Sequence, residues 1–201
     1  MPLRSPRGVL VVTSAAFVVL ALAELFVGTV GPDTVIRDRL VTIASPAVIA
    51  AMRVVNVAGD WRFLLPATLL LFVVFARARR AWWVWTTLMI AAPLAEGALK
   101  IVVGRPRPEG AAFGFPSGHA TAAAAYFGAV LYLSESLRPE IRRPLRLIAT
   151  VMIVLVGIAR VMLRAHWPSD VLGGFALGLA LASAAAVLAV RRDASAADRR
   201  A

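Results

Sequence analysis

Residues 117–134 read SGHATAAAAYFGAVLYLS, an apolar run that opens on a serine, a glycine and a histidine. An apolar stretch of roughly 17 to 25 residues can cross the hydrocarbon core of a bilayer as a helix. The chain offers further stretches of this kind at residues 8–30, 62–76, 81–103, 146–163 and 168–190. We therefore expect an all-α polytopic membrane protein with a bundle of six transmembrane helices.

The composition agrees with a protein embedded in a bilayer. Of the 201 residues, 60% are hydrophobic, and the mean hydropathy is +0.80. This length suits a single membrane-embedded domain, residues 1–201, that ends in a basic tail at 191–201. Arg4 and Arg7 precede the first apolar stretch as they would in a signal sequence. No clear small-residue cleavage site follows, so we expect this helix to be retained.

Charged residues interrupt the apolar pattern between positions 33 and 58. They are Asp33, Arg37, Asp38, Arg39 and Arg53. The interior of a bilayer accepts such side chains only at a high cost in free energy. An amphipathic helix in the membrane interface therefore fits this segment better than a seventh span.

The arginines orient the predicted bundle. One side of it carries 13 of the 22 basic residues, namely Arg4, Arg7, Arg77, Arg79, Arg80, Arg138, Arg142, Arg143, Arg146, Arg191, Arg192, Arg199 and Arg200. Cytoplasmic loops of membrane proteins are enriched in Lys and Arg, so this side is expected to be cytoplasmic. The opposite, extracytoplasmic side carries three clusters of polar residues.

The first cluster follows the predicted span 81–103. Lys100 lies near the end of this span, and Gly-Arg-Pro-Arg-Pro at 104–108 stops the helix, because each proline removes a backbone donor and restricts the residue before it. Lys100 and Arg107 are then fixed near one point, where an ammonium group and a planar guanidinium can hold phosphate oxygens. The alternative is that these cations snorkel to lipid headgroups.

The second cluster is Pro116-Ser117-Gly118-His119. Ser117 is a favourable N-cap, and the free amides at the start of a helix attract an anion. Gly118 lets a ligand approach the backbone, and His119 is placed to give a proton to a leaving oxygen. A capping serine beside an interfacial histidine is the alternative interpretation.

The third cluster joins Arg160 to His166 and Asp170. Pro168 suits the first turn of a helix, from which Asp170 can reach a ring nitrogen of His166 four residues earlier. A histidine held in one tautomer by a carboxylate exposes its other nitrogen as a nucleophile or base. Arg160 would neutralise phosphate charge beside it, although a His and an Asp at this spacing also occur for structural reasons.

All three clusters emerge on one side of the predicted bundle. No span separates the first from the second, and two spans separate the second from the third. Three polar residues near them lie outside these clusters. Arg105 either contacts a headgroup or lies solvated in the interface, Glu24 in the first span has no partner that we can name, and Glu96 is one turn before Lys100, a spacing that favours an ion pair.

The composition excludes several kinds of function. The chain has no cysteine and two histidines, so it has no thiolate chemistry and cannot build a usual zinc site from those ligands. The net charge of +11 does not predict nucleic-acid binding, because the basic residues lie in short clusters between apolar runs.

Taken jointly, the spacings are Lys, six residues, Arg-Pro; then Pro-Ser-Gly-His; then Arg, five residues, His, three residues, Asp. In this pattern the chain resembles the type 2 phosphatidic acid phosphatase superfamily of integral membrane lipid phosphatases. The motifs cover residues 100–170, and the six-span layout extends the likeness to most of the chain. The family's third motif usually opens with a serine where this chain has Ala159, which implies one lost phosphate contact and slower or altered turnover.

The resemblance implies roles for the clusters. His166 attacks phosphorus to give a phosphohistidine, Asp170 orients it, and His119 protonates the leaving oxygen and can then activate water. The phosphoryl oxygens are held by Lys100, Arg107, Ser117, Gly118 and Arg160. No metal or other cofactor is required.

The resemblance further implies a multi-pass enzyme of a bacterial plasma membrane, acting on a lipid phosphate that comes from the bilayer. Undecaprenyl diphosphate is the first expectation, and phosphatidic acid and phosphatidylglycerol phosphate are the other candidates. The oligomeric state is not indicated. A phosphotransferase that uses a lipid or sugar acceptor is an alternative, and a headgroup-binding or transport bundle without activity is a second one.

Overall fold

The computed structural model describes residues 5–28, 31–109 and 112–198, with side chains up to Arg192. Arg4, Arg199 and Arg200, which the orientation argument uses, lie outside the described residues. The elements are α1 (Pro6–Phe26), α2 (Gly31–Thr42), α3 (Pro46–Val57), α4 (Trp61–Val74), α5 (Ala76–Arg80), α6 (Trp82–Val103), α7 (Gly118–Leu133), the 3-10 turn η1 (Ser134–Ser136), α8 (Pro139–Met162) and α9 (Pro168–Asp198).

The described residues are all-helical apart from the loops, as the sequence predicts. The six predicted apolar stretches correspond to the helices α1, α4, α6, α7, α8 and α9. Of these, α1, α6, α8 and α9 are long and apolar enough to cross a bilayer. With 14 and 16 residues, α4 and α7 are shorter than a typical span. The count of six spans therefore stays a prediction. The first residues of the predicted tail, up to Asp198, extend α9.

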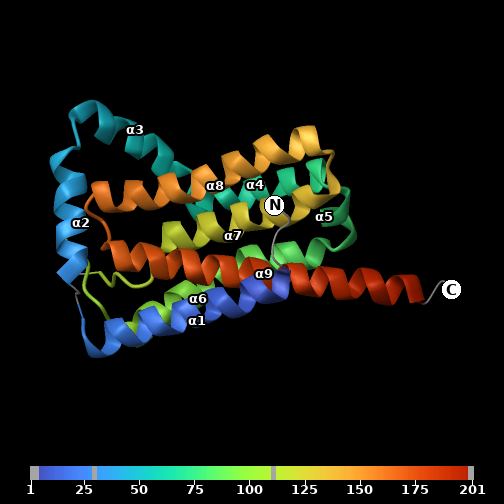
Figure 1. The fold of residues 1–201 in the computed structure, drawn as a ribbon, viewed down its shortest axis with the longest axis horizontal. Helices are drawn as coiled ribbons and strands as arrows, with labels where there is room; N and C mark the ends of the chain where they lie inside the picture. Colours follow the sequence, from blue (N-terminus) through green and yellow to red (C-terminus); the bar gives the residue numbers. More distant parts are fainter. Residues whose placement is uncertain (1–4, 29–30, 110–111, 199–201) are drawn as a thin grey trace.

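The segment 33–58 forms two helices where the sequence predicts one. α2 and α3 meet at an angle of 116°. The break has a local cause, since the side chain of Ser45 accepts a hydrogen bond from the amide of Val48 and Pro46 begins the new helix. Figure 1 shows α2 running across one end of the bundle while the long helices run along it. The interfacial position of this segment stays a prediction.

Helix α7 is the centre of the packing. Most of its residues are buried, and it packs against α4, α6, α8 and α9. Its alanines allow the backbones to come close, and so does Gly174 on α9: a Cβ there would lie 2.7 Å from the carbonyl oxygen of Ser117. Small residues at such crossings are the usual means of tight packing between membrane helices.

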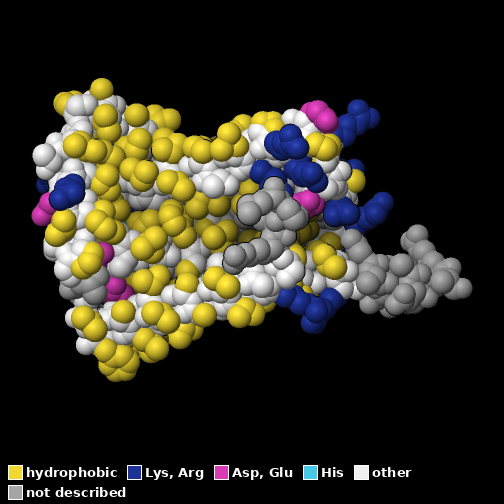
Figure 2. All heavy atoms as spheres, in the orientation of Figure 1, with side chains coloured by type: hydrophobic (Ala, Val, Ile, Leu, Met, Phe, Trp, Pro, Cys, Tyr) yellow, Lys and Arg dark blue, Asp and Glu magenta, His cyan; other side chains and the backbone are white. Residues whose placement is uncertain are grey.

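The surface has the pattern of a protein within a bilayer. Large apolar side chains are exposed along the helices, for example Val11, Val19, Leu69 and Ile101, and Figure 2 shows this apolar surface over the middle of the molecule. Lys and Arg gather at the end opposite α2 in the same view. Because a soluble monomer rarely exposes so large an apolar area, the helices are membrane-embedded.

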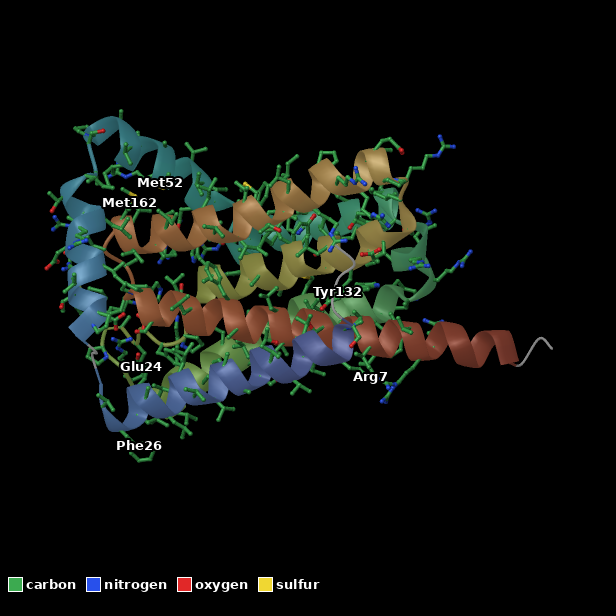
Figure 3. All side chains as sticks on the ribbon, in the orientation of Figure 1. Arg7, Glu24, Phe26, Met52, Tyr132 and Met162 are labelled. Carbon is green, nitrogen blue, oxygen red and sulfur yellow. The ribbon has the colours of Figure 1, made fainter. Side chains whose placement is uncertain are left out.

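The two ends of the bundle differ in what they hold. Figure 3 places Glu24 and Met162, near the C-terminal ends of α1 and α8, at the end that α2 covers, and Arg7 toward the opposite end. The end of α6 and the starts of α7 and α9 also lie at the α2 end. The three polar clusters therefore share one end of the bundle.

Candidate active site

Lys100 and its neighbours form one wall of the site. α6 ends at Gly104, which has a φ of +64° and donates its amide to the carbonyl of Lys100, a termination that favours glycine. Glu96 forms an ion pair with Lys100, which confirms the pair that the spacing predicts. Both side chains line a cavity of about 170 Å³ that also touches Gly118 and His119.

Arg107 is held by its own loop. Its Nε donates to the carbonyl of Phe113 at 3.1 Å, and its backbone amide donates to the carbonyl of Ala112 at 3.2 Å. From this position Arg107 acts electrostatically on His166 and on Arg160. Pro106 and Pro108, on either side of Arg107, restrict the backbone of the loop. The loop therefore holds the guanidinium near the third cluster.

Ser117 occupies the N-cap position of α7, but its hydroxyl does not cap the helix. The backbone amide of Ser117 donates to the carbonyl of Asp170 at 2.9 Å, which ties the starts of α7 and α9 together. Its Oγ is buried and has no hydrogen-bond partner among the described residues. A buried hydroxyl left unpaired is costly. This group is available to a ligand.

His166 lies in the connection between α8 and α9 and is 1% exposed. Its Nδ1 lies 3.3 Å from Oδ2 of Asp170, and the same oxygen accepts the amide of Trp167 at 2.9 Å. Asp170 thus caps the N-terminus of α9 and contacts the imidazole of His166 at the same time. The contact that the four-residue spacing predicts is present.

The surroundings of His166 favour a neutral ring. Burial lowers its pKa from 6.5 to about 4, with the positive charges of Arg160 and Arg107 acting in the same direction and Asp170 opposing them. A neutral imidazole whose Nδ1–H donates to Asp170 has a lone pair on Nε2. The ring therefore has the protonation state of a nucleophile at neutral pH.

Arg160, in the last turn of α8, is anchored by a residue that the sequence reasoning missed. Its Nη1 donates to Oδ1 of Asn56 on α3 at 2.6 Å. Asn56 is the only asparagine of the chain and stands between two valines, a signal that could have singled it out. Ala159, next to Arg160, is fully buried.

The clusters converge. Lys100, Arg160 and His166 all act electrostatically on His119, and so does Asp60, the N-cap residue of α4. Gly59 also lies against His119, because a Cβ there would be 3.0 Å from the histidine Cβ. The structure thus brings all the predicted site residues to one region, and it adds α3 and the start of α4 to its walls.

Arg105 does not lie solvated in the interface. It is 4% exposed and forms ion pairs with Glu24, Asp33 and Asp170. Glu24, for which the sequence offers no partner, is therefore paired with Arg105 at 2.9 Å. Sequence spacing missed this contact because the two residues come from different helices.

A membrane-embedded helical bundle that gathers a neutral histidine, a carboxylate and several cations at one end has the groups of a phosphoryl-transfer enzyme. Known proteins agree with this class. The model of the PAP2 superfamily matches residues 109–193, a range that contains the second and third clusters and begins just after the first.

Full-length relatives match as well. Phosphatidylglycerophosphatase B of Bacillus subtilis (strain 168) is 32% identical over 176 residues, which cover 82% of this chain and 87% of that protein. The crystal structure of the transmembrane PAP2 type phosphatidylglycerolphosphate phosphatase from Bacillus subtilis superposes with a TM-score of 0.75 at 29% identity, covering 92% of this chain and 96% of that chain. The chain therefore belongs to the PAP2 superfamily and is a metal-independent membrane lipid phosphatase.

Two further likenesses are more distant. Lipid A 1-phosphatase of Rhizobium etli is 35% identical over 112 residues, 48% of this chain and 44% of that protein. The crystal structure of Aquifex aeolicus LpxE has a TM-score of 0.58 at 19% identity, covering 81% of this chain and 96% of that chain. The second likeness concerns the fold alone.

Proposed function

We propose that this protein hydrolyses a phosphate ester of a membrane lipid through a phosphohistidine on His166. The observation that carries the proposal is the pairing of a buried, neutral His166 with Asp170 within the electrostatic reach of Arg107 and Arg160. A positioned nucleophile surrounded by fixed cations supplies both needs of phosphoryl transfer, orientation and stabilisation of charge.

The reaction has two steps. In the first, Nε2 of His166 forms a bond to phosphorus while the bond from phosphorus to the lipid oxygen breaks. His119, which takes up a proton when the negatively charged phosphate is bound beside it, gives that proton to the lipid oxygen. In the second, the now neutral His119 takes a proton from water, whose oxygen forms a bond to phosphorus while the bond from phosphorus to Nε2 of His166 breaks. This step releases inorganic phosphate and returns His166 to its neutral form. Asp170 stabilises the positive charge that the ring of His166 carries between the two steps.

The remaining site residues bind the phosphoryl group. Lys100, Arg107 and Arg160 supply positive charge, the unpaired Oγ of Ser117 supplies a hydroxyl, and Gly118 supplies an amide at the start of α7. Lys100 is shared between Glu96 and the phosphate. Ala159 lacks the hydroxyl usual in the family, and we expect slower turnover for that reason.

An apolar cavity next to the polar one supports a lipid substrate. It measures about 210 Å³, lies between α4 and α6, and shares Trp61, Pro93 and Ala122 with the cavity that holds Lys100 and His119. A lipid can place its phosphate in the polar part and the first segment of its tail in the apolar part. We infer that the substrate reaches the site laterally from the bilayer.

Phosphatidylglycerol phosphate is the substrate that we propose first, because the relative that matches most of the chain is a phosphatidylglycerophosphatase. Undecaprenyl diphosphate, favoured from the sequence, and phosphatidic acid complete the panel to be tested. The concentration of arginine at the opposite end of the bundle supports a site on the extracytoplasmic face of a bacterial plasma membrane.

The test is phosphate release by the purified protein in detergent micelles, with a metal chelator present. We expect release from at least one lipid of the panel, inhibition by vanadate, and an acid-labile, alkali-stable label on the protein after a brief reaction with ³²P-labelled substrate. The variant His166→Ala should lose both label and turnover, while Arg39→Gln, an exposed change on α2, should keep both. Substantial turnover by His166→Ala would refute the mechanism, and label recovered on an added alcohol would identify a phosphotransferase.

A further inference from the structure

Four buried ionisable side chains from four parts of the chain meet around Arg105. Arg105 comes from the loop after α6, Glu24 from α1, Asp33 from α2 and Asp170 from α9. Their side chains are at most 3% exposed. We call this set the Arg105 cluster, and none of its members except Asp170 has a role in the steps above.

The contacts in the cluster are short and divide the guanidinium among its partners. Nη1 of Arg105 donates to Oδ1 of Asp170 at 2.7 Å, and Nη2 donates to Oδ2 of Asp33 at 2.6 Å. Nε lies 2.9 Å from Oε2 of Glu24. The planar fork of an arginine can bridge several carboxylates in this way, which a lysine cannot reproduce.

Asp170 uses its two oxygens for different purposes. Oδ1 faces Arg105, while Oδ2 accepts the amide of Trp167 and faces Nδ1 of His166. Gly114 leaves room for this arrangement, because a Cβ there would lie 2.8 Å from Oδ2. The carboxylate is thus held from both sides, and its rotation away from His166 would break the bond to Arg105.

Asp33 fixes the same region from a second direction. Its Oδ1 accepts the amide of Ser169 at 2.8 Å, and its Oδ2 accepts the hydroxyl of Ser169 at 2.6 Å. The start of α9 is therefore capped by a carboxylate of α2. Ser169, which Asp33 fixes in this way, directly precedes Asp170 in the sequence.

Asp33 shares the positive charge of Arg105 with Asp170. The carboxylate of Asp33 offsets part of the charge by which Arg105 would otherwise weaken Asp170 as an acceptor. Replacing a buried ion pair by apolar residues of similar volume is often neutral or stabilising. The cluster therefore calls for a reason other than stability.

We propose that Arg105 is a positioning residue for catalysis, supported by Asp33 and Glu24. It holds the carboxylate of Asp170 against Nδ1 of His166, which keeps the proton on Nδ1 and the lone pair on Nε2. This inference rests on the proposed function, because it assumes that His166 is the nucleophile. It gives α1 and α2, which carry no motif, a part in the reaction.

The experiment compares Arg105→Gln with Arg39→Gln, an exposed arginine of α2, and Asp33→Asn with Asp38→Asn, an exposed acid of the same helix. We expect Arg105→Gln to lower kcat and the rate of phosphohistidine formation at least tenfold while KM changes less than threefold, since Arg105 does not touch substrate. Asp33→Asn should lower kcat several-fold, and the two control variants should behave as the parent protein.

Two measurements separate positioning from a merely structural role. In ¹⁵N spectra of histidine-labelled protein, the ring of His166 should show a single Nδ1–H tautomer in the parent and a mixture in Arg105→Gln. In a double-mutant cycle, adding Arg105→Gln to Asp170→Asn should cost less than twofold, because the carboxylate that Arg105 positions is already gone.

The outcomes distinguish failure of the proposed function from failure of this inference alone. If His166→Ala remains active, the proposed function fails and this inference fails with it. If His166→Ala is inactive but Arg105→Gln has the parent kcat and tautomer, only this inference is overturned. Should Arg105→Gln not fold, Arg105→Lys replaces it: an ammonium group reaches fewer carboxylates, so kcat should again fall about tenfold at unchanged KM, and a parent-like kcat overturns the inference.

Discussion

Nη1 of Arg160 lies 2.6 Å from Oδ1 of Asn56, so the C-terminal end of α8 is tied to α3 by a hydrogen bond. Arg160, the donor, belongs to the third cluster of the sequence motif, whereas Asn56, the acceptor, belongs to none of the three clusters. The contact shows that α3, which follows the sharp bend after α2, forms a wall of the site and positions one of its cations.

Removing this anchor should weaken phosphate binding. A hydrogen bond to a charged group contributes about 1.5–3 kcal/mol, so we expect Asn56→Ala to lower kcat/KM by about tenfold or more, with a raised KM. Steady-state kinetics on the preferred lipid measure the effect, and Arg53→Gln on an exposed position of the same helix is the control. Equal kinetics in Asn56→Ala and the parent would show that Arg160 needs no anchor.

The titration of His166 can be followed directly. The chain has two histidines, so histidine-labelled protein gives two sets of ring signals, and a His119→Asn variant identifies those of His166. We expect a midpoint near pH 4, because burial lowers the pKa of His166 to about 4. A midpoint near 6.5 would mean that water reaches the ring freely.

This pKa has a consequence for stability. The unfolded chain takes up a proton at this histidine below about pH 6.5, whereas the folded state does so only below about pH 4. The contribution of His166 to the free energy of unfolding is therefore fully present above pH 6.5, and it is lost as the pH falls from 6.5 toward 4. Melting temperatures of the parent protein between pH 8 and pH 4.5 should fall accordingly.

The crossing of α7 and α9 should be sensitive to a single methyl group. A Cβ at Gly178 would lie 2.7 Å from the Cβ of Ala124 and 2.9 Å from the amide nitrogen of Ala125. A Cβ at Gly97 would meet no atom within 4 Å among the described residues, apart from its chain neighbours and the backbone of its own helix. Overpacking costs about 1–3 kcal/mol, so Gly178→Ala should lower Tm by several degrees. Gly97→Ala should leave Tm unchanged or slightly raised, and equal Tm values in the two variants would contradict the packing.

The orientation of the bundle can be tested with single cysteines, because the chain contains none. Glu109, near the candidate site, and Glu140, in the first turn of α8, are both exposed. We expect a membrane-impermeant maleimide added to intact cells to label Glu109→Cys and to spare Glu140→Cys until the membrane is opened. The reverse pattern would place the site in the cytoplasm.

Local sequence was sufficient wherever the contact lies within a few residues. The pairs Glu96 with Lys100 and His166 with Asp170 are one helical turn apart, and the structure contains both. The all-helical membrane fold also followed from apolar runs, since their length reflects the thickness of a bilayer. The division of 33–58 into α2 and α3 was not foreseen, although Ser45-Pro46 is a helix-start signal.

The sequence by itself determined the membrane-embedded helices, the shared end of the three clusters and the family, because periodicity, helix parity and motif spacing are properties of the chain. The tertiary structure alone decided the partners of Arg105 and Arg160. Three of these partners, Glu24, Asp33 and Asn56, are separated from the arginine that they contact by 72 or more positions in the sequence. Only the packing of α1, α2 and α3 against the motif-bearing loops makes them neighbours. A buried charge must find a partner in space, and sequence distance does not say which one.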